Sequence, residues 1–469
     1  MKSIVKLSVF TLVGVMLGGC ALGPEYQRPQ MPLPSEFHHT PGWKLAQPAD
    51  VEASVAWWAL YKDQQLAQLL QQLESSNQNL RAAEAAWREA HALVRGSRSA
   101  LYPKASGQLS SARQGNDIGA GKTNEIAIGL SWQLDVWGQI RRQVEASQAQ
   151  AQASAAEWAS VRLSQQSELV QNYFQLRVLD EEARLLDATL EAYERSLRTT
   201  ENRYKAGMVT RADVSQALTQ LKNAQVQRLE LAWRRARFEH AIALLVGSTP
   251  NAVQITPLES VPELPALPLT VPSTLLERRP DIAVAERRVM AANAEVGVAQ
   301  TAYFPDLVLS ANGGYRGSNL ADWISVPNRF WSIGPQFAIT LFDAGLRRSK
   351  VAQAKARYDQ QVARYRQTTL QAIGEVEDAL VQLNVLAQEI EVQHQALAAA
   401  QDTLRLIENQ YQAGMVDYLS VSSAQTTMLN SERNLLNLKG AQLIASVQLI
   451  SALGGGWQGV AHTTSKKER

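Results

Sequence analysis

Two stretches of the chain alternate between large apolar residues and small or polar residues. In the first stretch, Ile126, Ile128, Leu130, Trp132 and Leu134 alternate with Ala127, Gly129, Ser131 and Gln133. In the second, Trp331, Ile333, Phe337, Ile339 and Leu341 alternate with Ser332, Gly334, Gln336, Ala338 and Thr340. A period of two predicts β-strands with one apolar face, which suits a lipid-facing barrel strand or a soluble sheet packed on helices. Weaker partner strands are expected near 105–114 and 307–316.

A helical period follows each pair of strands and predicts two very long helices. The stretch 345–411 contains no proline, and the spacings along its apolar seam alternate between four and three residues. The seam consists of Val376, Leu380, Leu383, Ala387, Ile390, His394 and Leu397. At 1.5 Å per residue, about 65 residues form a rod of roughly 100 Å. The alanine-rich stretch 138–204 is its counterpart.

The chain contains two copies of one unit. Residues 201–209 (Glu-Asn-Arg-Tyr-Lys-Ala-Gly-Met-Val) recur at 408–416 with seven of nine positions identical, an offset of 207 residues. The same offset relates Gly138 to Gly345 and Gly247 to Gly454. Each copy reads as a short helix, two strands, a very long helix, a turn and a long helix. A proline-rich linker, which cannot be helical throughout, separates the copies.

The N-terminus has the pattern of a secretory signal. Lys2 and Lys6 flank the start of an apolar run over 4–17, which is too short to span a membrane as a helix. The run ends in Leu-Gly-Gly-Cys, which resembles a bacterial lipobox and implies acylation of Cys20. Ala21 follows in place of the aspartate of inner-membrane retention, so the resemblance points to the outer membrane. The alternative is an ordinary cleaved signal that ends near a cysteine.

A lipid anchor and rods of this length favour barrel strands over a soluble sheet. Four strands cannot close a barrel, and open sheet edges cannot be left in hydrocarbon. Since known barrels begin at eight strands, we expect an oligomeric barrel of two or more copies.

Charge and composition exclude several other classes of protein. Net charge is +2 with both signs interspersed, so no polybasic surface for nucleic acid is expected. The six histidines show no metal-ligand spacing beyond the adjacent His38 and His39, so neither a metal nor a cofactor is expected. The glycines from Gly454 to Gly459 match G-x-G-x-x-G but follow a helix rather than a strand, and we interpret them as a helix stop. The sequence therefore does not indicate an enzyme.

The chain resembles the TolC-like outer membrane factors, in the lipoprotein branch that serves resistance-nodulation-division (RND) efflux systems. The resemblance rests on Cys20, Trp57-Trp58, 277–282 (Glu-Arg-Arg-Pro-Asp-Ile), 302–305 (Ala-Tyr-Phe-Pro), the paired Tyr-x-Ala-Gly-Met-Val turns and 452–457. The resemblance implies an α+β membrane protein, a homotrimer with a twelve-stranded outer-membrane barrel continuous with a helical periplasmic barrel. It also implies a periplasmic adaptor and an inner-membrane RND pump as partners, outer membrane lipid around the barrel, and passive export of drugs and other small toxic solutes. The alternatives are metal-ion efflux, type I protein secretion, or a periplasmic coiled-coil scaffold lipoprotein.

The expected organisation follows the repeat. We assign 1–19 to the signal peptide, 20–62 to the N-terminal anchor and equatorial segment, and 63–247 to the first repeat. The equatorial linker covers 248–273, the second repeat 274–456 and a C-terminal tail 457–469.

The turns at Gly207 and Gly414 are the main candidate sites. Glycine is a common C-cap, Thr210 with Asp213 predicts a capping box, and Asp417 takes the matching N-cap position. The family resemblance places these turns at the periplasmic tip, with adaptor docking at Tyr204, Gly207, Met208, Gly414 and Met415. It also implies that Asp213 and Tyr411 hydrogen-bond in a gate, together with Asp417, Ser420 and Ser423. This sequence departs from the family pattern at Val416, where TolC has an arginine, and at both serines, where it has aspartates.

Overall fold

The computed structural model describes residues 22–30, 56–116, 119–258, 262, 264–265 and 279–455. Cys20, the signal segment and the C-terminal tail lie outside these residues. The chain divides into two compact units. The first contains residues 1–31, 84–157 and 281–368, which include the β-sheet, and the second contains residues 32–83, 158–280 and 369–469.

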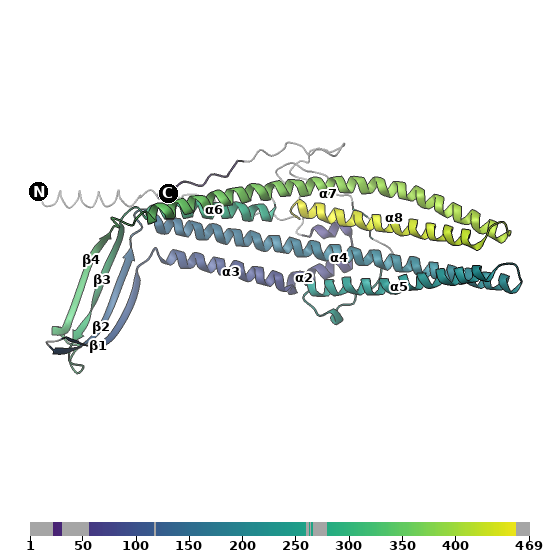
Figure 1. The fold of residues 1–469 in the computed structure, drawn as a ribbon. Helices are drawn as coiled ribbons and strands as arrows, with labels where there is room; N and C mark the ends of the chain where they lie inside the picture. Colours follow the sequence, from purple (N-terminus) through teal and green to yellow (C-terminus); the bar gives the residue numbers. More distant parts are fainter. Residues whose placement is uncertain are drawn as a thin grey trace. The chain divides into compact units, whose positions relative to one another are not determined.

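The first unit contains one antiparallel sheet in the order β1-β2-β3-β4 (Figure 1). Its strands are β1 (Lys104–Asn116), β2 (Gly119–Gln133), β3 (Asp306–Gly317) and β4 (Arg329–Ala338). Both predicted strands and both partner strands are confirmed in kind. The prediction that the last strand continues through Ile339 and Leu341 is wrong, because β3 begins at Asp306, whose partner is Ala338, and leaves nothing for later residues to pair with.

One face of this sheet is apolar across all four strands. The register aligns Ala105, Leu130, Ala311 and Ile333 in one row, and the next row contains Ile128 and Trp331. These large side chains are unpacked in the single chain, where Ile128 is 66% and Trp331 74% exposed. The opposite face is polar.

The polar face has its own row of Lys104, Ser131, Ser310 and Gly334. An ion pair also lies on it, with Arg316 donating to Glu125 at 3.0 Å. The sheet therefore has the two faces that the alternation predicts.

The long helices of the two repeats have equal lengths. Helices α4 (Gln139–Lys205) and α7 (Leu346–Gln412) each contain 67 residues, and α5 (Arg211–Leu245) and α8 (Tyr418–Ala452) each contain 35. The short helices α3 (Gln78–Ser99) and α6 (Pro280–Thr301) each contain 22. The expected pattern of helix, two strands, long helix, turn and long helix is confirmed. No helix of the described residues is both long enough and apolar enough to span a membrane.

The predicted seam of α7 is correct only in part. Val376, Leu380 and Leu397 are buried and Leu383 and Ile390 are half-buried, but Ala387 and His394 are exposed, and Leu386, which is not in the seam, is buried. Leu386 comes six residues after Leu380, which at 3.6 residues per turn places it about 120° away from the seam around the helix axis. The predicted seam is therefore interrupted at Ala387 and His394, and Leu386 is buried on another face of α7.

The core of the second unit lies where α2 (Gln64–Ser76) and the short helix η2 (Trp57–Tyr61) pack on α4. Leu66, Leu70 and Leu73 are fully buried there with Tyr173 and Phe174. Burial of each such side chain stabilises the fold by about 1.5 to 3 kcal/mol.

Buried charges attach the start of the linker to the helices. Arg177, 1% exposed, donates to Asp180 at 3.0 Å and to the carbonyl oxygen of Thr256 at 2.7 Å. Arg235 donates to the same aspartate at 2.7 Å and to the carbonyl oxygen of Ile255 at 2.6 Å. Each guanidinium also binds backbone. Loss of either arginine would therefore detach the linker from the helices and remove one partner of the buried Asp180 carboxylate.

We expect Asn77→Ala to lower the free energy of unfolding by about 1 to 2 kcal/mol. The Asn77 side chain is buried between α2 and α3, accepts from the backbone N–H of Leu80 at 3.0 Å and donates to the carbonyl of Leu245 at 2.7 Å. The thermal unfolding midpoint, followed by circular dichroism, measures this loss. Asn79→Ala, at an exposed position with one bond to Gln165, is the control, and equal midpoints for the two variants would contradict the prediction.

Candidate functional site

The two glycine turns lie together at one end of the second unit (Figure 1). Gly207 has φ +72° and Gly414 φ +74°, values that favour glycine, although a Cβ would meet nothing within 4 Å at either position. The N–H of Met208 donates to the carbonyl of Arg203, and that of Met415 to the carbonyl of Gln410, each at 2.9 Å. Both turns thus end their helices in the same way, as the repeat predicts.

The acidic residues of the tip cap the helices that leave it. Thr210 and Asp213 form the predicted capping box, in which the Asp213 carboxylate accepts from the Thr210 N–H at 2.8 Å. Asp417 is the N-cap of α8 and accepts from the N–H and the hydroxyl of Ser420 at 3.0 and 2.8 Å. The Ser420 hydroxyl is the first cause, and the backbone N–H the second, that lower the pKa of Asp417. Ser423 is exposed on the same helix.

Tyr411 is packed into a small cluster rather than paired with an acid. Its ring lies 5.8 Å from that of Tyr418 in an edge-to-face arrangement, beside Ala217 and Val421. Its hydroxyl is buried and has no hydrogen-bond partner among the described residues of one chain. Within one chain the structure does not join Tyr411 to Asp213, so a bond between them stays a prediction for the assembled channel.

Arg203 is a tip residue that the sequence reasoning missed. Its guanidinium donates to the carbonyl oxygens of Tyr411 and Gln412, each at 2.9 Å, and lies 4.6 Å from the centroid of the Tyr411 ring. These bonds join the last turn of α4 to the last turn of α7. The repeat contained a signal, since Gln410 occupies the equivalent position in the second copy and only the first copy has an arginine.

A row of hydrogen bonds links all four long helices behind the tip. The hydroxyls of Ser196 (α4) and Tyr418 (α8) lie 3.2 Å apart, and Tyr418 donates to Gln220 (α5) at 3.4 Å. Gln220 donates to Gln425 at 3.2 Å, and Gln425 to Glu408 of α7 at 3.4 Å. Burial raises the pKa of Tyr418, so its hydroxyl stays protonated and able to donate. Polar residues at inward-facing helix positions were the signal for this row.

Apolar side chains project from the turns themselves. Met208 is 70% and Met415 68% exposed, and Tyr204 is exposed as well.

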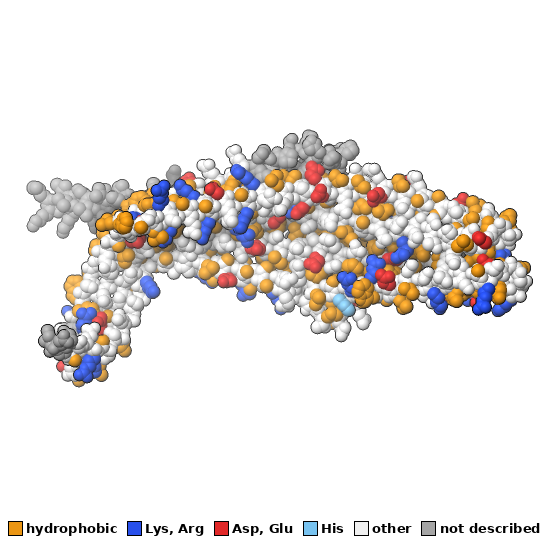
Figure 2. All heavy atoms as spheres, viewed as in Figure 1, with side chains coloured by type: hydrophobic (Ala, Val, Ile, Leu, Met, Phe, Trp, Pro, Cys, Tyr) orange, Lys and Arg blue, Asp and Glu red, His pale blue; other side chains and the backbone are white. Residues whose placement is uncertain are grey.

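Basic and acidic side chains are interspersed along the helices on the face shown in Figure 2. No group of three or more His, Cys, Asp or Glu side chains in the described ranges could hold a metal ion.

The sheet, the paired rods and the tip agree with one known family. Its sequence profile, the outer membrane efflux protein family, matches residues 69–248 and 271–455. The chain belongs to this family.

Relatives match over nearly the whole length. The chain is 30% identical over 467 residues to the probable efflux pump outer membrane protein TtgC of Pseudomonas putida, which covers 97% of this chain and 96% of TtgC. It is 31% identical over 454 residues to the cation efflux system protein CusC of Escherichia coli, covering 95% and 98%. The solved outer-membrane channel OprN superimposes with a TM-score of 0.84 at 29% identity, covering 94% of this chain and all of OprN.

Membership of the outer membrane efflux protein family explains the open sheet. The chain has the fold of the trimeric channels of this family, in which three chains with four strands each form a twelve-stranded barrel. The unpaired outer edges of β1 and β4 then meet the neighbouring chains, as the exclusion of open edges from hydrocarbon requires. The protein is thus the outer membrane channel of a tripartite efflux system.

Proposed function

We propose that this channel is the exit duct for drugs and other small toxic solutes, working with a periplasmic adaptor and an inner-membrane RND-type pump. The observation that carries the proposal is the match with TtgC over 97% of this chain. Cation export is the second candidate, because the likeness to CusC is equally strong.

Susceptibility of a deletion strain tests the two candidates. We expect loss of the gene to lower the minimal inhibitory concentrations of several chemically different drugs and dyes, and complementation to restore them. Metal cations form the second arm of the same panel. Sensitivity to cations alone would overturn drug export in favour of cation export.

We propose that the tip of the channel docks the adaptor and closes the duct at rest. Tyr204, Gly207, Met208, Gly414 and Met415 are the proposed docking residues, supported by the exposed side chains of the methionines and the tyrosine. Exposed apolar side chains in contiguous patches are typical of protein interaction sites.

The proposed gate contains Asp213, Tyr411, Asp417, Ser420 and Ser423. The unpartnered hydroxyl of Tyr411 supports a role between subunits, since a buried polar group without a partner costs about 1 to 3 kcal/mol. The bonds from Arg203 to α7 support its addition to this gate.

We propose that Cys20 anchors the mature chain to the outer membrane through its acyl chains, whereas the barrel strands insert by their own apolar faces. Each buried methylene contributes about 0.8 kcal/mol, so several acyl chains anchor firmly. The Leu-Gly-Gly-Cys motif supports the assignment.

The anchor is tested by metabolic labelling with palmitate. We expect label in the parent and none in Cys20→Ser, while the variant still forms oligomer. Label that persists in Cys20→Ser would overturn the acylation site.

A further inference from the structure

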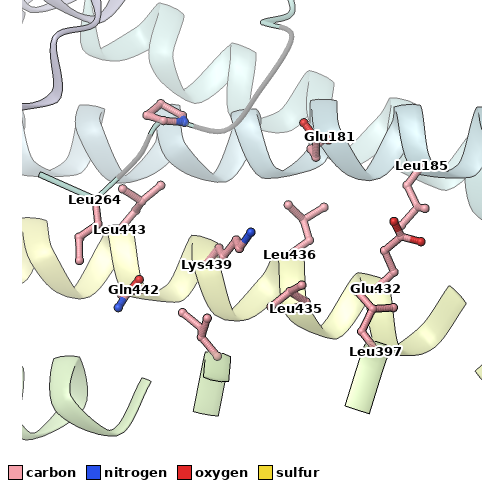
Figure 3. A pocket seen from close by; sticks show the side chains of 12 residues that line it. Glu181, Leu185, Leu264, Leu397, Glu432, Leu435, Leu436, Lys439, Gln442 and Leu443 are labelled. Carbon is pink, nitrogen blue, oxygen red and sulfur yellow. The ribbon is translucent and has the colours of Figure 1, made fainter. Parts of the chain in front are cut away.

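A pocket of about 490 Å³ lies in the second unit, outside the tip. Its walls come from α4, α7, α8 and the linker, with Leu185, Leu264 and Leu436 among the apolar side chains that line it. Figure 3 shows Leu436 and Glu432 on the side of α8 that faces α4. The volume is in the range of small-molecule sites, which measure roughly 300 to 1,000 Å³.

Among the residues that the structure describes, one carboxylate in this pocket has no counter-ion. Glu432 is half-buried and makes no hydrogen bond or ion pair within the described residues, whereas Glu181 is paired with Arg184. Burial first, and the charge of Glu181 second, raise the pKa of Glu432. Both effects disfavour the bare carboxylate, so a bound cation that shields it would be stabilised there.

Among the described lining residues the basic group is Lys439, and its position orients such a ligand. Lys439 is exposed and lies seven residues after Glu432 on α8, about 10.5 Å along the helix axis. It repels a cation from its own end of the pocket. The positive charge of a ligand is therefore favoured beside Glu432, with its apolar part against the leucines.

We propose that this pocket binds a hydrophobic organic cation of small-molecule size, held by Glu432 and the surrounding leucines. This site goes beyond the proposed function, because it is separate from the tip and its occupation requires neither pump nor adaptor.

Equilibrium binding to the purified full-length channel in detergent tests the proposal. The probes are tetraphenylphosphonium, a hydrophobic cation, and triphenylphosphine oxide, a neutral analogue, with protein-free micelles as the blank. We expect saturable binding of the cation, which Glu432→Gln weakens by about tenfold, the equivalent of roughly 1.4 kcal/mol. We expect the same variant to leave binding of the neutral analogue unchanged.

Two further variants complete the test. Glu230→Gln removes an exposed carboxylate from α5 and is expected to bind both probes like the parent. Lys439→Gln removes the repelling charge and is expected to bind the cation more tightly than the parent does. Equal effects of Glu432→Gln and Glu230→Gln, equal affinity of the parent for both probes, or no saturable binding would each overturn the site.

Discussion

Leu130→Arg is expected to remove most of the assembled channel from the outer membrane, whereas Ser131→Arg is expected to assemble nearly like the parent. Leu130 lies on the apolar face of the sheet, in one row with Ala105, Ala311 and Ile333. A charge that faces lipid near the bilayer midplane costs about 2 to 4 kcal/mol, and this cost recurs in each chain of a trimer. Ser131 lies on the opposite, polar face.

The measurement is the amount of heat-modifiable oligomer in outer membrane fractions. Ser131→Glu is a second polar-face control, because the cross-strand partner of Ser131 is Lys104 and an arginine there would face a like charge. Equal assembly of Leu130→Arg and Ser131→Arg would show that the apolar face does not meet lipid.

Arg203→Gln is expected to raise the single-channel conductance in planar bilayers and to sensitise cells to large antibiotics that the outer membrane normally excludes. The change removes two bonds from a charged donor to the end of α7 and a cation–π contact with Tyr411. For a partly exposed group we expect a loss of about 1.5 to 3 kcal/mol per chain. Three copies of this loss would shift a closed-to-open equilibrium by several orders of magnitude.

Glutamine is the informative replacement because the second repeat already has it at position 410. Arg198→Gln, at an exposed position of the same helix, is the control for the loss of charge alone. If Arg203→Gln assembles normally and conducts like the parent, these bonds belong to helix packing and not to the gate.

Tyr411→Phe tests whether the hydroxyl of Tyr411 bonds to a neighbouring subunit. Within one chain it removes only an unbonded hydroxyl, so a rise in conductance would place the hydrogen-bond partner of Tyr411 in a neighbouring subunit. Combining Tyr411→Phe with Asp213→Ala would remove the capping box of α5 as well, so the single variant is the cleaner experiment.

The sequence by itself determined the elements and their duplication. Strand faces and helix lengths follow from local periodicity, because side chains project at fixed intervals of 2 and 3.6 residues. The alternation around Leu130 therefore predicts the apolar face, and the constant offset of 207 residues predicts long helices of equal length. Capping at Asp213 and Asp417 is also local, since each bond spans only three residues.

Only the tertiary structure decided the features that depend on distant neighbours. The last strand ends at Ala338 because its partner strand begins at Asp306. The alternation within the last strand carries no information about where its partner begins. In α7, Ala387 and His394 of the predicted seam are exposed while Leu386, on another face, is buried, because the helices packed around α7 decide which positions face inward. Arg203 meets the carbonyl of a residue 208 positions later, and the polar row behind the tip joins four helices. Local periodicity does not predict such contacts, because they form only when separate helices are packed side by side.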